Sequence, residues 1–215
     1  MSQYAWIEES LSLPRFLPYF KACAGDVDAA LHLYWWNLEV SAGFYAPLHC
    51  LEIGLRNALH VELAQRFGRP DWWAVCGLPE SGTRLVDEAV RSLRPTSGRT
   101  PTADDVVAAL SFGFWVSLLS RGNEQLLWRP ALYRAFRPNY RGPRAALHQH
   151  FEHMRHFRNR IMHHEPIYDR HLQADLDRIY ELVGFFSPAM VSELRRIDAL
   201  PAIMARSPRS AAAGP

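Results

Sequence analysis

The sequence is poor in cysteine and has no long apolar run. Its three cysteines, Cys23, Cys50 and Cys76, are scattered and odd in number, which argues against a disulfide framework and a cysteine-based zinc site. Polar or charged residues interrupt each apolar stretch before it reaches membrane-spanning length, and no cationic segment leads into an apolar signal core near the start. These absences favour a cytoplasmic protein of a reducing compartment, with no membrane partner.

Several common catalytic motifs are also missing. The chain has no glycine-rich phosphate loop, no Gly-x-Ser-x-Gly elbow and no His-Glu-x-x-His pair. His150, His153 and His156 recur at a spacing that lets helical side chains share a metal ion, but no carboxylate stands beside them at a metalloprotease spacing. We therefore expect neither a metal nor another cofactor.

The overall composition is that of a globular domain. Hydrophobic residues make up 48% and charged residues 21% of the 215, which is enough apolar material for one substantial core. We expect a single domain over residues 1–206 and a disordered tail over residues 207–215.

Positive charge is concentrated locally, although the formal net charge is only +2. Few acidic residues offset the arginines between positions 129 and 170, and several histidines lie among them. This region could bind a polyanion such as RNA. Its arginines are Arg129, Arg134, Arg137, Arg141, Arg144, Arg155, Arg158, Arg160 and Arg170.

Apolar residues recur at helical spacing through most of the chain, and alternating strand patterns are scarce, so the sequence predicts an all-α fold. Turn and capping residues then divide the chain. The expected helices cover residues 13–23, 27 to a break at 43–47, 47–67, 83–93, 102–120, 144–165, 170–184 and 187–203.

The segment from Arg158 to Ile167 contains the side chains best suited to catalysis. Arginine binds phosphate oxygens through a planar fork of donors, and histidine can exchange a proton near neutral pH, so these residue types suit RNA cleavage without a metal. Arg158 lies at the edge of the apolar face that Phe157 and Ile161 share, so it needs a partner. On a straight helix Arg158 and His163 point about 140° apart. Either the helix deforms near Pro166, or two helices or two subunits build the site.

Three motifs follow one another along the chain. Residues 51–57 read Leu-Glu-Ile-Gly-Leu-Arg-Asn, residues 111–115 read Ser-Phe-Gly-Phe-Trp, and Arg158-Asn159 is followed by His163-His164-Glu165-Pro166. This set resembles the Abi-like (abortive infection) family of the HEPN ribonuclease superfamily. The resemblance covers roughly residues 31–184.

The resemblance implies a HEPN-like helical bundle, here with an N-terminal helical elaboration, that forms a homodimer with two motif copies in one groove. It implies a metal-independent endoribonuclease acting in phage defence, or as the toxin of a toxin–antitoxin pair with an antitoxin protein as partner. In that scheme His163 is the general acid or base, Arg158 stabilises charge on phosphorus, and Asn159 orients the phosphate or the histidine. Some members only bind nucleic acid.

The supporting residues have two interpretations each. His164 either hydrogen-bonds locally or replaces His163 as proton carrier, and Arg160 either binds the substrate backbone or is solvated. Glu52 and Arg56 either form an ordinary intrahelical pair or line the cleft, with Glu52 pairing Arg158 and Arg56, next to Asn57, contacting phosphate.

The aromatic motif is expected to be structural. Phe112, Phe114 and Trp115 should lie in the core, with Gly113 permitting a close helix approach. Trp35, Trp36, Trp72 and Trp73 are expected to be buried as well. Two further functions remain open: a catalytically inactive module that binds RNA or protein, and a purely structural helical oligomer whose dimer would hold its two Arg158 and His163 sets far apart and away from solvent. His163 itself could also be an ordinary surface histidine near a helix end.

Overall fold

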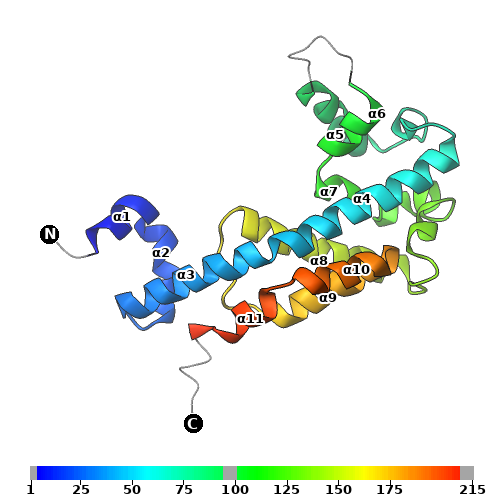
Figure 1. Cartoon of the computed structure of the whole chain (residues 1–215). Helices are drawn as coiled ribbons and strands as arrows, with labels where there is room; N and C mark the ends of the chain where they lie inside the picture. Colours follow the sequence, from blue (N-terminus) through cyan, green and yellow to red (C-terminus); the bar gives the residue numbers. More distant parts are fainter. Residues whose placement is uncertain (1–3, 94–100, 209–215) are drawn as a thin grey trace.

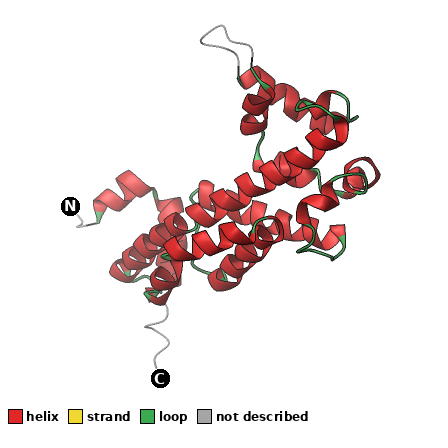
Figure 2. Ribbon diagram, turned by 45° about the vertical axis from the view of Figure 1, so that its right-hand side comes forward, coloured by secondary structure: helices red, strands yellow, loops and turns green. Residues whose placement is uncertain are grey.

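The computed structural model describes residues 4–93 and 101–208. Within these two ranges every regular element is helical, as Figure 2 shows, and the all-α prediction is confirmed. No helix in the same ranges combines the length and the apolar character needed to cross a bilayer.

The helices run in the order α1 (Ala5–Leu11), α2 (Leu13–Ala22), α3 (Val27–Gly43), α4 (Tyr45–Phe67), α5 (Glu80–Ser92), α6 (Ala103–Ala109), α7 (Phe112–Ser117), α8 (Arg144–Met162), α9 (Leu172–Phe186), α10 (Pro188–Ile197) and α11 (Leu200–Ala205). Short 3-10 and π turns lie between them: η1 (Trp72–Ala74), η2 (Arg121–Asn123), η3 (Glu124–Trp128) and η4 (Leu132–Phe136).

Two long helices, α3 and α4, form the axis of the molecule, and Figure 1 shows them almost end to end. The Asp26 side chain caps α3 by accepting a hydrogen bond from the backbone N–H of Ala29 at 3.0 Å. Gly68 ends α4 in the left-handed conformation that glycine adopts without strain. Both boundaries agree with the sequence prediction.

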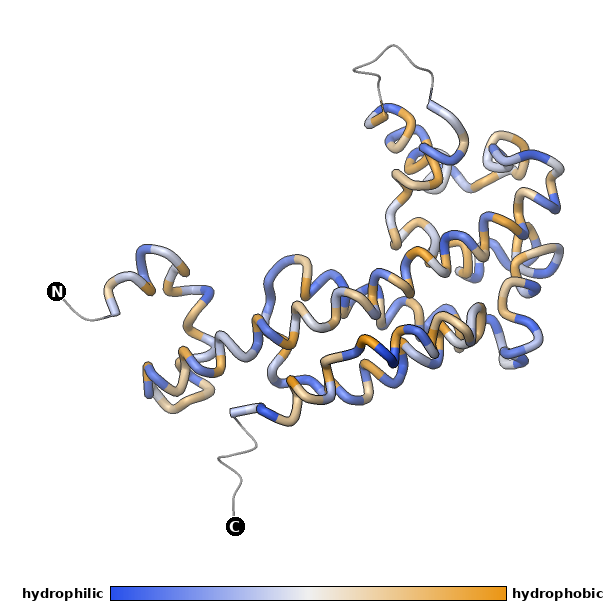
Figure 3. The backbone as a smooth tube through the Cα atoms, in the orientation of Figure 1, coloured by the Kyte–Doolittle hydropathy of each residue, from blue (hydrophilic) through white to orange (hydrophobic). Residues whose placement is uncertain are grey.

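The remaining helices pack along this axis. Helix α9 lies against α4, α10 covers α9, α11 returns to α3, and α7 contacts both α4 and α8 (Figure 1). Hydrophobic and hydrophilic residues alternate along each helix at short intervals (Figure 3), as expected where one face packs inward. The buried apolar side chains form one core cluster.

Several predicted boundaries were wrong. The helix expected over 102–120 begins with the predicted Thr102–Asp105 capping box but breaks at Leu110, and the Ser111 side chain caps a new helix. The region 187–203 is two helices, and α1 was not predicted. Residues 95–101, whose polar composition predicts a surface loop, lie outside the described residues except for Pro101, and the predicted tail over 207–215 does so except for Ser207 and Pro208.

The aromatic predictions hold with two corrections. Phe112, Phe114 and Trp115 are buried, as are Trp36 and Trp72, and Trp73 is partly buried, but Trp35 is 49% exposed. Gly113 does not serve close packing, since a Cβ there would make only ordinary contacts, with Arg155 Cδ at 3.5 Å and Ser111 Oγ at 3.7 Å. Gly54 does, since a Cβ would lie 2.2 Å from the Phe186 ring.

Candidate functional site

The helices that carry the three motifs are far apart in the sequence but pack together in the structure. The first lies on α4, the second forms α7, and the third lies at the end of α8. Helix α7 packs against both of the others. The Phe44 and Phe157 rings, 4.8 Å apart, join the start of α4 to α8. The helices that carry the three motifs therefore pack together.

Glu52 and Arg158 form the polar link between α4 and α8. The Arg158 Nε atom lies 3.4 Å from Glu52 Oε2, and both side chains are about one third exposed or less, at 32% and 28%. Arg158 Nε is buried and forms no aligned hydrogen bond, so the pair is held by charge rather than by a directed bond. The predicted need of Arg158 for a partner is met by the predicted partner.

The end of α8 explains how the motif leaves the helix. The helix ends at Met162 rather than at 165, because His164 adopts a positive φ of 58°. The backbone N–H of Glu165 donates to the Arg160 carbonyl, and that of His164 to the Ile161 carbonyl. This is a Schellman ending, in which a residue other than glycine occupies the left-handed position. His163 and His164 therefore lie on a turn, and the angles of a straight helix do not apply to them.

Polar contacts from two sides fix this turn. Arg160 donates to the Pro166 carbonyl at 2.5 Å and lies 3.6 Å from Glu165, so it is neither free nor simply solvated. The buried Asn37 of α3 accepts a hydrogen bond from the backbone N–H of Ile167 at 2.8 Å. Such a buried amide bond holds a loop firmly, because losing it would leave a polar group without a partner.

An N-terminal helix supplies a residue that the motifs do not include. Arg15 of α2 donates to the His164 carbonyl at 3.1 Å. Two hollows, of about 300 Å³ and 260 Å³, adjoin this contact, and Arg15, His164 and Glu165 line both. His163 borders the larger one. The N-terminal elaboration thus forms one wall of the site.

The other predicted site residues lie on the same helices, but hydrogen bonds and ion pairs do not connect all of them. The Arg56 Nε atom donates to Asn57 Oδ1 at 3.2 Å, and the described residues include no ion pair between Arg56 and Glu52. Within the same ranges, the side chains of Asn159 and His163 make no hydrogen bond, and none links His163 to Arg158. One copy of the chain therefore presents the arginine and the histidine as separate groups.

The three α8 histidines that recur at a metal-sharing spacing contact three different side chains. His153 contacts the buried carboxylate of Asp175 at 3.2 Å, His150 contacts Arg178 at 3.5 Å, and His156 lies 3.7 Å from Glu152. Burial lowers the pKa of His150, which favours its neutral form. No group of three metal-ligating side chains occurs in the described ranges.

The arginine cluster divides into two sets. A carboxylate lies within ion-pair distance of six members: Arg129, Arg144, Arg155, Arg158, Arg160 and Arg170. In the part of the chain that the structure describes, Arg134, Arg137 and Arg141 have no such partner. The sequence predicted one polyanion-binding region, and the structure confines its uncompensated charge to the segment before α8.

Sequence reasoning missed two residues of the site. Asn37 is an amide within the apolar run Tyr34-Trp35-Trp36-Asn37-Leu38, and this interruption is a signal that could have identified it. Arg15 had no such signal, because its role depends on how α2 folds back over the end of α8.

Comparisons with known proteins gave no match: no family model, no curated protein and no solved structure matches this chain. What the site does is therefore inferred from its own residues and from the motif resemblance.

Proposed function

We propose that the chain is a metal-independent endoribonuclease of the HEPN type, Abi-like in its motifs, acting in phage defence or as the toxin of a toxin–antitoxin pair. The supporting observation is that the helices carrying the three motifs pack together, with Glu52 of the first motif ion-paired to Arg158 of the third. If the short motifs resembled the family only by chance, there would be no reason to expect the helices that carry them to pack together.

In the proposed reaction, the 2′-hydroxyl oxygen of one nucleotide attacks the adjacent phosphorus, and the bond from phosphorus to the 5′-oxygen of the next nucleotide breaks. The 2′-hydroxyl loses a proton, the departing 5′-oxygen gains one, and the products are a cyclic phosphate and a 5′-hydroxyl. His163 suits one of these transfers, because its exposed imidazole has no partner among the described residues.

Arg158 suits the stabilisation of charge on phosphorus. Its Nε edge faces Glu52, which leaves the terminal nitrogens of the guanidinium for phosphate oxygens. Glu52 then holds the side chain in place. Asn159, on the same turn of α8, is available to orient phosphate or imidazole.

A homodimer would join the separated groups. Trp35, Leu38 and Tyr45 are exposed apolar residues spaced three and seven apart along α3 and the start of α4, the seam period of a helix–helix contact. Leu38 also lines the hollow that contains His164 and Glu165, so this stripe adjoins the motif turn. A second copy at the stripe would bring its own motif to the same place.

Cleavage tests the proposal directly. We expect the purified protein to cut single-stranded RNA in the presence of a chelator and to leave cyclic-phosphate ends. Arg158→Gln and His163→Asn should each lower the rate by about 100-fold or more, as is usual when a proton-transfer group or a charge stabiliser is lost. His156→Asn, on the same helix but 70% exposed, is the matched control and should cut normally. Intact RNA recovered from the wild type would instead favour the binding module.

Mixing inactive variants tests the composite site. If Arg158 of one subunit works with His163 of the other, a re-equilibrated equal mixture of Arg158→Gln and His163→Asn should recover about a quarter of wild-type activity, since half of the dimers are mixed and each has one intact site. A site contained within one chain would recover nothing. Sedimentation of Leu38→Glu, with Val61→Glu on α4 as control, tests the stripe itself.

A further inference from the structure

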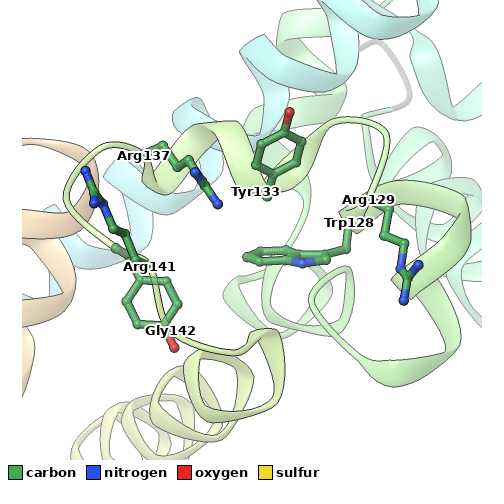
Figure 4. Close-up of a pocket in the computed structure, with 7 residues that line it drawn as sticks. Trp128, Arg129, Tyr133, Arg137, Arg141 and Gly142 are labelled. Atoms are coloured by element: carbon green, nitrogen blue, oxygen red, sulfur yellow. The ribbon is translucent and has the colours of Figure 1, made fainter.

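Another hollow lies before the start of α8, at the end of this helix opposite to the motif turn. It has a volume of about 240 Å³ and is lined mainly by arginine and aromatic side chains from η3, η4 and the loop that follows (Figure 4). These are Trp128, Arg129, Tyr133, Arg137, Tyr140 and Arg141. We refer to it as the Trp128 pocket.

The charge of the Trp128 pocket is not neutralised. Arg129 lies 3.4 Å from Glu124, but that carboxylate is shared with Arg144, also at 3.4 Å. Neither Arg137 nor Arg141 has a carboxylate within ion-pair distance in residues 4–93 and 101–208. Guanidinium groups that face solvent without an acidic partner are available for a phosphate.

The aromatic side chains provide flat surfaces beside this charge. The Trp128 indole is partly buried, packs at 5.9 Å from the Phe136 ring and lies across the pocket, with Tyr133 on one side (Figure 4). The Arg137 guanidinium lies over the Tyr133 ring at 5.6 Å. Tyr140 is held by a hydrogen bond from its hydroxyl to the Pro143 carbonyl at 2.8 Å. The pocket walls are therefore fixed before a ligand arrives.

We infer that the Trp128 pocket binds a nucleotide, with the base stacked on the Trp128 indole and the phosphate held by Arg137 and Arg141. A nucleotide combines a π-face with an adjacent anion, which are the two features that this pocket matches. An acidic peptide would use the arginines but leave the indole without a partner.

The pocket is separate from the motif turn. It adjoins the first residue of α8, and Arg158 follows Arg144 by fourteen positions, which is about 21 Å along a helix. Nucleotide binding there does not depend on cleavage at Arg158 and His163. The nucleotide could be free, or it could be one unit of a single-stranded RNA that also reaches the motif turn.

Two probes distinguish these sources. Titration calorimetry with AMP measures binding of a free nucleotide, and fluorescence anisotropy with a labelled 2′-O-methyl oligoadenylate measures binding of a strand that lacks the attacking hydroxyl. Saturable AMP binding that the pocket variants weaken assigns a free nucleotide. Pocket-dependent binding of the oligonucleotide alone assigns a unit of RNA. Because this probe cannot be cut, failure of the proposed ribonuclease would not affect the result.

Matched variants of the full chain decide whether the pocket is responsible. Arg137→Gln with Arg141→Gln should weaken binding about tenfold or more, as should Trp128→Leu, because each removes one of the two interactions. Arg84→Gln with Arg91→Gln on α5 removes the same charge elsewhere and should change binding little. The double arginine variant alters only exposed side chains, so it remains informative if Trp128→Leu folds poorly. If neither probe binds, or if the α5 variant weakens binding equally, the inference is overturned.

Discussion

Arginines along α8 and in the turn after it are held by carboxylates, whereas in the described part of the segment before α8 Arg134, Arg137 and Arg141 have no carboxylate within ion-pair distance and only Arg129 has one. Arg155, Arg158 and Arg170 lie within 2.7, 3.4 and 2.8 Å of Glu152, Glu52 and Asp175. Arg137 and Arg141, on the other side of the α8 start, contact aromatic rings or open solvent. The same residue type therefore fixes helices together in one region and leaves positive charge available in the other.

This difference shows why a cluster of arginines in a sequence does not by itself define a binding surface. A paired guanidinium has already exchanged water for a carboxylate, and it binds a phosphate only through the edges that remain free. Arg158 belongs to the paired set yet keeps part of its side chain exposed, which suits a group that is both positioned and chemically available.

The largest expected effect comes from breaking the most buried pair. Asp175 is 5% exposed and accepts two hydrogen bonds from Arg170 at 2.8 Å, while the Arg170 guanidinium lies over the Phe157 ring. We expect Asp175→Ala to lower the free energy of unfolding by about 3 kcal/mol, because it leaves the mostly buried Arg170 guanidinium, 21% exposed, without its carboxylate. Urea unfolding measures this. Glu193→Ala breaks the exposed Glu193–Arg196 pair and should have almost no effect; equal losses would show that burial does not distinguish these pairs.

The next effect concerns the packing that holds the first motif. Gly54→Ala should cost roughly 1–3 kcal/mol, because the new methyl group would overlap the Phe186 ring and push α9 from α4. Gly113→Ala in the second motif meets only an ordinary contact and should be neutral or slightly stabilising. Thermal denaturation of the two variants compares them directly, and a larger loss for Gly113→Ala would contradict the packing described.

A smaller effect depends on pH. Burial lowers the pKa of His60, and its Nδ1 accepts a hydrogen bond from the Trp72 indole at 3.2 Å. As pH falls through 6.5, the ordinary value, the unfolded chain takes up a proton before the folded chain does, so stability should decrease below that pH. His60→Gln keeps an acceptor but does not titrate. Its urea midpoint should decrease less between about pH 7 and about pH 5.5 than that of the wild type. Burial also lowers the pKa values of His148 and His150, so part of the decrease in stability toward low pH should remain in His60→Gln.

The smallest effect on stability is expected from replacing arginines that have no carboxylate partner. Arg137→Gln with Arg141→Gln should change the free energy of unfolding by less than about 0.5 kcal/mol, because these exposed side chains hold no carboxylate. Thermal denaturation of this double variant and of Asp175→Ala compares the stability lost with an unpaired arginine and with a paired one. A loss comparable to that of Asp175→Ala would place these arginines with the structural ones.

The helical elements were largely predictable because their signals are local. The Asp26 cap, the Thr102–Asp105 capping box and the Gly68 stop each depend on a few neighbouring residues, and all three are present. The end of α8 was not predictable in this way. Pro166 suggested a helix to 165, but the left-handed turn at His164 ends it three residues earlier, supported by contacts from Asn37 and Arg15.

The site was predictable in part. A charged residue at the edge of an apolar helix face needs a partner, and the sequence offered Glu52, which the structure places beside Arg158. Arg160 could not be assigned, because its contact with the Pro166 carbonyl forms only once the chain turns back. The burial of Trp35 was predicted wrongly, since residue type alone does not show whether another helix covers that face.

The sequence by itself determined the helical class, the main helix boundaries and the residues able to exchange protons and bind phosphate, because spacing and side-chain chemistry are properties of the chain. Only the tertiary structure decided which arginines are neutralised, that Arg15 lines the hollows beside His164, and that the Trp128 pocket exists. These depend on contacts between residues far apart in sequence, since the energy of a charge is set by the groups that folding brings near it.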